Sequence, residues 1–232
     1  MSKKEVRFLE LAELRADQDE EKGSWIEGYP IVFNQETVIG GMCREVIEPE
    51  AVTGELLKDV RLLTGHDFSG VPLARTRNNN GNATMQLTVD EHGVHMRALL
   101  DTENNPKAKE AYSAVKRGDI SGMSFAFIVN EESWEDLDTD LPLRRITGID
   151  HIFEVSLVAF PAYEGTSVQA ASEGDALESV KASLESARKQ LEEERAAAAA
   201  AEEVRQAEEA AQERRRAVLE RLENLKKEVS AK

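Results

Sequence analysis

The side chains best suited to chemistry in this chain are Ser124 and His66, each set in or beside an extended apolar segment. Ser124 lies in the run Met123-Ser-Phe-Ala-Phe127, where strand alternation places Ser124 and Ala126 on one face and the larger side chains on the other. A serine hydroxyl is a weak nucleophile at neutral pH and needs a neutral imidazole within hydrogen-bond reach. On spacing alone, a serine held by a nearby main-chain group is the commoner interpretation of this pattern.

Four histidines are available as the base: His66, His92, His95 and His151. His66 follows a predicted strand and a glycine, whereas His92 falls in a predicted hairpin turn, where exposed histidines are common. The spacing of His92 and His95 could suggest a metal site. In a hairpin the two side chains need not converge, and no cysteine joins them. The sequence therefore predicts His66 as the base, with no metal and no cofactor.

A third residue must orient the imidazole and stabilise its charge. Glu154 is the first candidate because it is a carboxylate inside the apolar run 152–160, and acidic residues are seldom buried without a partner. A solvent-facing position on an edge strand is an equally good interpretation of Glu154. Asp150 is the second candidate. Asp67 is adjacent to His66 and would point elsewhere in an extended segment.

Composition limits the classes of function. The 232 residues carry a formal net charge of -16, of which residues 173–232 contribute only -3. This balance argues against a nucleic-acid-binding protein, which needs clustered Lys and Arg. The single cysteine, Cys43, excludes a disulfide framework and is expected to be a small buried hydrophobe. No apolar run approaches about 20 residues, and no signal-peptide core is present, so we expect no membrane association and a cytoplasmic location.

Residues 1–170 are predicted to form a domain of many short strands. Residues 84–89 and 94–100 alternate on either side of a glycine-containing turn, which predicts a hairpin. The charged segments 15–22 and 131–142 are expected to be loops.

Two segments in this domain, 49–58 and 105–117, have helical character, and Gly118 ends the second. Together with the strands they indicate an α+β fold, mainly β. We expect a small closed or nearly closed β-barrel with flanking helices.

Residues 171–232 form a second region, rich in Ala, Glu and Arg. From residue 175 onward it contains no aromatic residue, glycine or proline. Leucines recur every seven residues at 177, 184 and 191, which predicts a long helix with a thin apolar seam. A helix this polar needs a partner helix to cover the seam, from a second copy of this chain or from another protein. We therefore expect a coiled-coil, scaffold-like tail, with an oligomer of this chain as one outcome.

Five segments in order carry a resemblance to a known family: Trp25-Ile-Glu-Gly-Tyr29, Leu62-Leu-Thr-Gly-His-Asp67, Pro72-Leu-Ala-Arg-Thr76, Gly118-Asp-Ile-Ser-Gly-Met-Ser-Phe-Ala-Phe127 and Phe153-Glu-Val-Ser-Leu-Val-Ala-Phe-Pro-Ala162. Together they resemble the prohead (head maturation) serine proteases of tailed phages, which are related in fold to the herpesvirus assemblins. The resemblance covers about residues 5–170, and it favours Ser124 as a nucleophile over a purely structural serine.

The resemblance implies that His66 is the general base, Ser124 the nucleophile and Glu154 the third member of a triad. Main-chain amides near Ala162 are suggested as oxyanion donors by analogy with the assemblins. Implied substrates are the major capsid protein with its scaffold region, and the protease itself; the portal is a further candidate partner. The site of action would be the assembling procapsid in the host cytoplasm. The alternative is a non-catalytic scaffold or assembly protein that uses a protease-like barrel and the helical tail.

Overall fold

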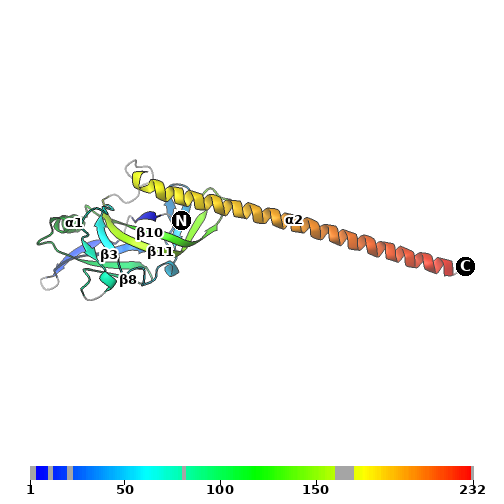
Figure 1. Ribbon diagram of the computed structural model, residues 1–232, viewed down its shortest axis with the longest axis horizontal. Helices are drawn as coiled ribbons and strands as arrows, with labels where there is room; N and C mark the ends of the chain where they lie inside the picture. The colour runs from blue at the N-terminus through cyan, green and yellow to red at the C-terminus, as the bar shows by residue number, and fades with distance from the viewer. Residues whose placement is uncertain (1–3, 10–12, 20–22, 80–81, 160–169, 231–232) are drawn as a thin grey trace. The chain divides into compact units, whose positions relative to one another are not determined.

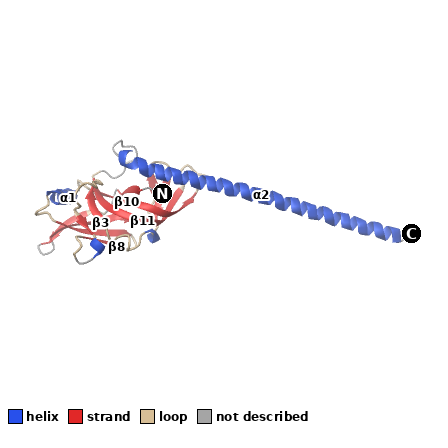
Figure 2. Ribbon diagram, viewed as in Figure 1, coloured by secondary structure: helices blue, strands red, loops and turns tan. Residues whose placement is uncertain are grey.

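The computed structural model describes residues 4–9, 13–19, 23–79, 82–159 and 170–230. The chain divides into two compact units, Met1–Leu184 and Glu185–Lys232. The first unit is a mixed α+β structure made mainly of strands (Figure 2). The sequence-based boundary after residue 170 therefore falls fourteen residues before the end of this unit, which includes the first turns of the C-terminal helix.

Eleven strands of the described residues form two sheets. The seven-stranded sheet contains β1 (Lys4–Leu9), β4 (Thr37–Ile39), β5 (Cys43–Ile47), β6 (Arg61–Thr64), β7 (Ala74–Arg75), β10 (Gly122–Glu135) and β11 (Leu143–Val158). The four-stranded sheet contains β2 (Arg15–Asp19), β3 (Gly23–Val32), β8 (Met85–Val89) and β9 (Gly93–Leu100). The helices are α1 (Pro106–Arg117) and α2 (Ala170–Ser230), with short 3₁₀ turns η1 (Pro49–Ala51) and η2 (Arg77–Asn79).

The larger sheet is organised around β10 and β11, two long antiparallel neighbours (Figure 1). Its strand order is β1-β10-β11-β5-β4, with β6 paired to the last part of β11 and β7 paired to β6. The smaller sheet has the order β2-β3-β9-β8. Both orders end in edge strands, so no closed barrel is found in the described part of the chain. The mixed α+β class is confirmed, and the predicted barrel is not.

The main core contains side chains from both sheets and from α1. Ile26 and Met96 come from the small sheet, and Phe125 and Phe127 come from β10; all four are at most 1 % exposed. The two phenylalanine rings stack with centroids 4.7 Å apart. The face of β10 that carries the phenylalanines is therefore fixed in the core, as alternation predicted, and Ser124 lies on the opposite face.

Helix α1 confirms the helix predicted from the sequence, and the residues that cap it explain where it begins and ends. The side chain of Asn105 accepts hydrogen bonds from the main-chain amides of Lys107 and Ala108, and Pro106 occupies the first turn. Gly118 closes the helix with φ of +80°, a conformation that glycine adopts at little cost. The chain then enters β10 directly, so the cap of α1 sets the start of the strand that carries Ser124.

Three sequence-based assignments of local structure were wrong. The charged segment 15–22 contains the edge strand β2, whose side chains are mostly exposed while its main chain pairs with β3. The segment 49–58 forms only the short turn η1 followed by further turns. The first five residues of the expected loop 131–142 are strand, because β10 continues to Glu135 opposite the start of β11.

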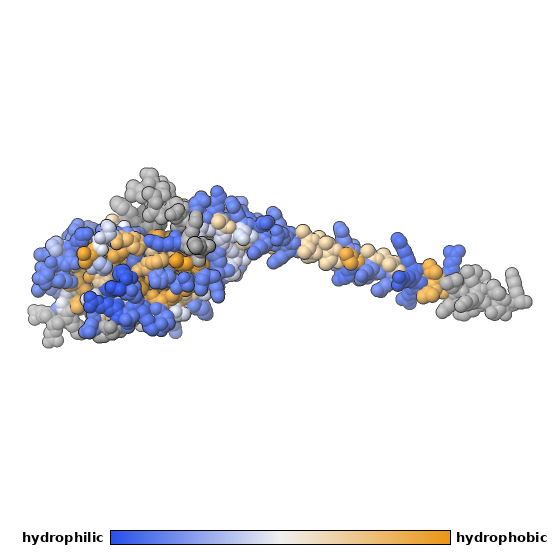
Figure 3. All heavy atoms as spheres, viewed as in Figure 1, coloured by the Kyte–Doolittle hydropathy of each residue, from blue (hydrophilic) through white to orange (hydrophobic). Residues whose placement is uncertain are grey.

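The predicted long C-terminal helix is confirmed as α2. Within the first unit, its residues Leu177 and Val180 pack against Ile39, Cys43 and Trp134. In the second unit, apolar and charged side chains both lie at the surface of the helix (Figure 3), and Val204, Val218 and Leu219 are more than half exposed. Among the described residues, no helix is long and apolar enough to span a membrane.

Candidate active site

The larger sheet places Ser124 next to the strand that carries Glu154. In the antiparallel pairing of β10 with β11, Ser124 lies opposite Ser156 and Ala126 lies opposite Glu154. Directly opposed residues of an antiparallel pair project to the same face of the sheet. Ser124, Glu154 and Ser156 therefore share one face, and each is 0 % exposed.

A parallel strand brings His66 to the same place. β6 runs beside the end of β11, with Leu63 opposite Ser156 and Thr64 opposite Leu157. Gly65 and His66 both follow with φ of +58°, so the chain turns sharply as it leaves the sheet. This conformation is uncommon for a residue other than glycine. It places the imidazole where Nδ1 lies 2.7 Å from Oε1 of Glu154.

Ser156 forms hydrogen bonds both to Glu154 and to the main chain of His66. Its hydroxyl donates to Oε2 of Glu154 at 2.5 Å and accepts from the main-chain amide of His66 at 3.1 Å. Both carboxylate oxygens of Glu154 thus have partners, and the turn that carries His66 is tied to β11. A carboxylate that accepts from Nδ1–H leaves Nε2 as the ring nitrogen that can take up a proton.

The hydroxyl of Ser124 is directed toward β1. It donates to the main-chain oxygen of Arg7 at 2.7 Å. β1 is antiparallel to β10, and Phe8 lies opposite Ser124. The structure therefore joins His66 to Glu154 directly, and it places Ser124 on the neighbouring strand with its proton bonded to a carbonyl. The catalytic roles of the three residues stay predictions.

The other candidate acid and base residues lie away from this cluster. Asp150 is exposed on β11, and His151 packs edge-on against Phe153. Asp67 accepts from the hydroxyl and amide of Ser69, and the hydroxyl bond holds the pKa of Asp67 below its ordinary value. Asp67 therefore serves the turn after His66 rather than the imidazole.

His92 and His95 both pack against the ring of Tyr29. In the described ranges, no group of three or more His, Cys, Asp or Glu side chains is arranged to hold a metal ion. Cys43 is fully buried, and burial raises the pKa of its thiol to about 11. At neutral pH it is a protonated thiol in an apolar cluster, as its sequence context predicted.

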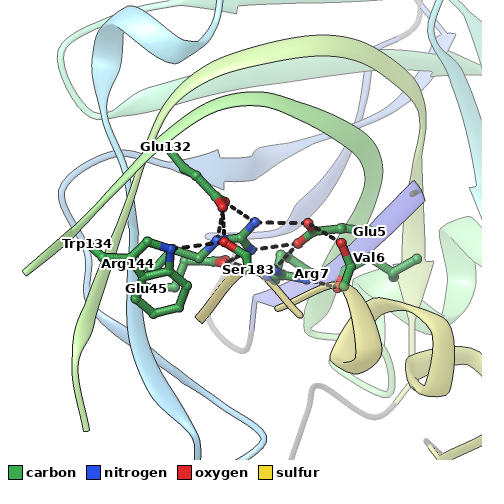
Figure 4. Close-up of polar contacts among 9 residues, drawn as sticks. Glu5, Val6, Arg7, Glu45, Glu132, Trp134, Arg144 and Ser183 are labelled. Atoms are coloured by element: carbon green, nitrogen blue, oxygen red, sulfur yellow. Dashed lines mark hydrogen bonds and ion pairs between the residues drawn. The ribbon is translucent and has the colours of Figure 1, made fainter. Parts of the chain in front are cut away.

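A buried charge cluster that was not predicted from the sequence joins β1 to the rest of the large sheet (Figure 4). Arg7 and Arg144 pair there with carboxylates from three other strand positions. Arg144 Nη1 lies 2.8 Å from both Glu5 and Glu45, and its Nε lies 2.6 Å from Glu132. Arg7 pairs with Glu5 and with Glu45, whose Oε2 lies 2.7 Å from Nη2. Every member except Glu132 has a side chain at most 8 % exposed.

The cluster changes the pKa values of its members. Burial alone would lower the pKa of Arg144, but hydrogen bonds and charge pairing with Glu5 and Glu45 raise it above its ordinary value. Burial would likewise raise the pKa of Glu5, and Arg144 and Arg7 together hold it below its ordinary value. Arg144 and Glu5 are therefore charged at neutral pH, and Ser179 of α2 donates a further hydrogen bond to Glu5 at 3.3 Å.

Ser156 belongs to this cluster, and the sequence did not identify it as a site residue. It shares its face with Glu154 by simple alternation, which is the one signal that could have identified it. The contact between Ser124 and Arg7 has no such signal, because the two residues are 117 positions apart. The region near Ala162, suggested for the oxyanion donors, lies outside the described residues.

Comparison with known proteins connects this geometry to one family. A family model described as Caudovirus prohead serine protease matches residues 11–181. The prohead protease of Enterobacteria phage HK97 is 27 % identical over 159 residues, which are 67 % of this chain and 63 % of that protein. The chain therefore aligns with less than two thirds of that relative's length. The bacteriophage T4 capsid assembly protease gp21 aligns with 66 % of this chain and 98 % of its own, at 12 % identity and a TM-score of 0.38, too low to inform the fold.

Proposed function

Since the chain belongs to the Caudovirus prohead serine protease family, we propose that it is a serine endopeptidase of procapsid maturation. The observation that carries this proposal is the contact of the half-buried His66 with the buried Glu154, 2.7 Å long, on the face of the sheet that Ser124 shares. A base held by an orienting carboxylate, on the same sheet face as a serine, supplies the three groups that nucleophilic acyl transfer requires.

In the proposed reaction, His66 Nε2 takes the proton of Ser124 as its Oγ bonds to the carbonyl carbon of the scissile peptide. Glu154 accepts from Nδ1–H and stabilises the positive charge on the imidazole. His66 then gives the proton to the leaving amine as the C–N bond breaks, which leaves an acyl ester on Ser124. Water, deprotonated by His66, hydrolyses the ester and returns the serine.

The proposed substrates are proteins of the procapsid. The relative is named a prohead protease, which supports substrates in the major capsid protein and its scaffold region. Cleavage of the chain itself, action on the portal and a location inside the procapsid in the host cytoplasm belong to the same proposal. The exposed apolar side chains of α2 suit pairing with scaffold helices, which would bring residues 171–232 and the attached enzyme into the shell.

The test is expression of this chain alone and together with its capsid protein, followed by mass spectrometry of both. Cleavage should disappear in Ser124→Ala and persist in Ser24→Ala, which removes another buried serine hydroxyl far from the cluster. Cleavage that survives in Ser124→Ala would overturn the assignment of the nucleophile. Cleavage lost only with a chelator would indicate a metallohydrolase, and no cleavage in any form would favour a non-catalytic assembly protein.

A further inference from the structure

Ser124 is inaccessible in this structure, and β1 is one of the elements that cover it. The side chain is 0 % exposed, and its hydroxyl donates to the main-chain oxygen of Arg7 in β1. Six consecutive residue pairs join β1 to β10, from Lys4 opposite Ile128 to Leu9 opposite Met123. A peptide carbonyl cannot reach the hydroxyl of a nucleophile that is fully buried, so access to Ser124 requires a movement.

β1 can leave the large sheet without breaking the pairing between any two other strands. It is an end strand, and β10 is the one strand with which it pairs in the described ranges. Any extended polypeptide can form the same main-chain hydrogen bonds with the edge of β10, because strand addition uses backbone groups that every residue carries. Exchange of β1 for another strand would therefore conserve the hydrogen bonding of the sheet.

The buried charge cluster also permits this exchange. β1 contributes one acid and one base, Glu5 and Arg7, so its departure leaves the net charge of the cluster unchanged. Arg144 would keep Glu45 at 2.8 Å and Glu132 at 2.6 Å as partners. Removal of one buried charge alone is strongly unfavourable, whereas removal of a neutral pair leaves no charge without a partner.

β1 also reaches the other side of the site. The ammonium of Lys4 lies 3.5 Å from the ring centroid of Phe68, two residues beyond His66. The strand thus contacts Ser124 through Arg7 and the turn of His66 through Lys4. β1 therefore touches both the strand that carries Ser124 and the turn that follows His66, as an extended substrate would have to.

We propose that β1 occupies the place of an extended substrate segment, and that a polypeptide substrate reaches Ser124 by replacing β1 as the antiparallel neighbour of β10. This inference rests on the proposed function. It identifies the ligand of the β10 edge as an extended peptide, and the conformation described here as a latent one. A basic side chain at the position of Arg7 would pair with Glu45 and favour the occupant that carries it.

A reversible cross-link tests the exchange without weakening the fold. Lys4 and Ile128 are directly opposed, and opposed residues of this kind lie close enough for a disulfide after small adjustment. Lys4→Cys with Ile128→Cys should form a disulfide that retains β1 on β10. The matched control is Gln86→Cys with Arg97→Cys, an opposed and exposed pair in the other sheet. Cys43 will not compete, because it is buried and its pKa is about 11.

The readout is the rate at which a biotinylated fluorophosphonate labels Ser124 in the full chain, with the site mapped by mass spectrometry. Oxidation of the Lys4/Ile128 pair should slow labelling about tenfold or more, since the probe binds only the open population, and reduction should restore the rate. Oxidation of the control pair should change nothing. Arg7→Met, which removes two buried ion pairs from β1, should label faster than the unmodified chain.

Equal labelling of the oxidised and reduced forms, together with cleavage of the capsid protein that depends on Ser124, would overturn this inference and leave the proposed function intact. If Ser124 is labelled in no form, including Arg7→Met, the proposed nucleophile fails and the inference fails with it. Ser124→Ala, which should show no labelling, confirms that the signal comes from this residue.

Discussion

The hydroxyl of Ser156 offers the sharpest test of how the candidate site is held together. Ser156→Ala removes a fully buried group that donates to Glu154 at 2.5 Å and accepts from the amide of His66 at 3.1 Å. The substitution leaves Ser124, His66 and Glu154 in place. In the proposed mechanism Ser156 is therefore a positioning residue, which acts through the carboxylate and through the turn of His66.

The structure supports an estimate of the effect. A hydrogen bond to a charged group contributes about 1.5–3 kcal/mol. Each ~1.4 kcal/mol of activation free energy corresponds to about a tenfold change in rate, so full loss of this bond in the transition state would slow acylation about 10- to 150-fold. KM should change little, because the hydroxyl of Ser156 bonds to Glu154 and to the amide of His66, and its proposed effect is on the base in the transition state.

The assay is single-turnover cleavage of the capsid protein, with thermal unfolding measured on the same samples. Ser156→Thr keeps the hydroxyl and should recover much of the rate. Ser24→Ala is the matched control, since Ser24 is also buried and has one side-chain hydrogen bond, to Thr102 at 3.1 Å. If Ser156→Ala and Ser24→Ala lose stability to a similar extent and both keep the full cleavage rate, Ser156 does not position the pair and the reasoning is refuted.

Three further predictions concern the buried groups. Arg144→Met should destabilise the fold by about 3–5 kcal/mol in urea denaturation, because it leaves two buried carboxylates with one cation. Arg145→Met removes ion pairs that are more exposed to water and should destabilise the fold clearly less. The pKa of Glu5 is lower in the folded state than its ordinary value. The stabilisation from ionised Glu5 is therefore present above that ordinary pKa and is lost as the pH falls. Glu5→Gln should make the free energy of unfolding less sensitive to acid. Cys43 should react with a thiol reagent at neutral pH only after unfolding.

Each of these predictions has a contrary outcome. Equal destabilisation by Arg144→Met and Arg145→Met would mean that burial does not strengthen the cluster. An unchanged acid limb of the stability curve in Glu5→Gln would show that other carboxylates dominate acid unfolding. Rapid modification of Cys43 in the folded chain would show that the apolar cluster around it opens readily.

Local features of the fold were predictable because they depend on neighbouring residues. The cap residues Asn105 and Gly118 fix the ends of α1, and the turn before Gly93 fixes the hairpin of β8 and β9. Alternation around Ser124 identified which face of β10 enters the core. These signals act within a few residues, so the sequence carries them directly.

The charged segments were predicted as loops although they contain strands, and the reason is physical. Edge strands expose both faces or one edge to water, so their side chains can be charged while their main chains pair. Asp17 and Gln18 in β2 pair with the apolar strand β3 in this way. Similarly, the acidic end of β10 is held by β11, where Arg145 pairs with Glu135 across the ladder.

The candidate site was predictable in its residue types but not in its assembly. Glu154 was identified because it is an acid within an apolar run. His66 was identified because it follows a predicted strand and a glycine. Their meeting depends on the parallel pairing of β6 with β11, a contact between distant segments that composition and periodicity do not encode. The contact of Arg7 with Ser124 depends in the same way on the antiparallel pairing of β1 with β10.

The spacing around Ser124 favoured a serine held by a nearby main-chain group, and its hydroxyl is indeed bound to the carbonyl of Arg7. This contact does not conflict with a catalytic role. A structural serine would need no histidine at the same face of the sheet, yet His66 is held there by a buried carboxylate and by Ser156. The carbonyl that holds Ser124 belongs to an edge strand whose buried charges form a neutral pair. The bond is therefore one that the protein can exchange, and the geometry fits a nucleophile kept covered until a substrate strand replaces β1.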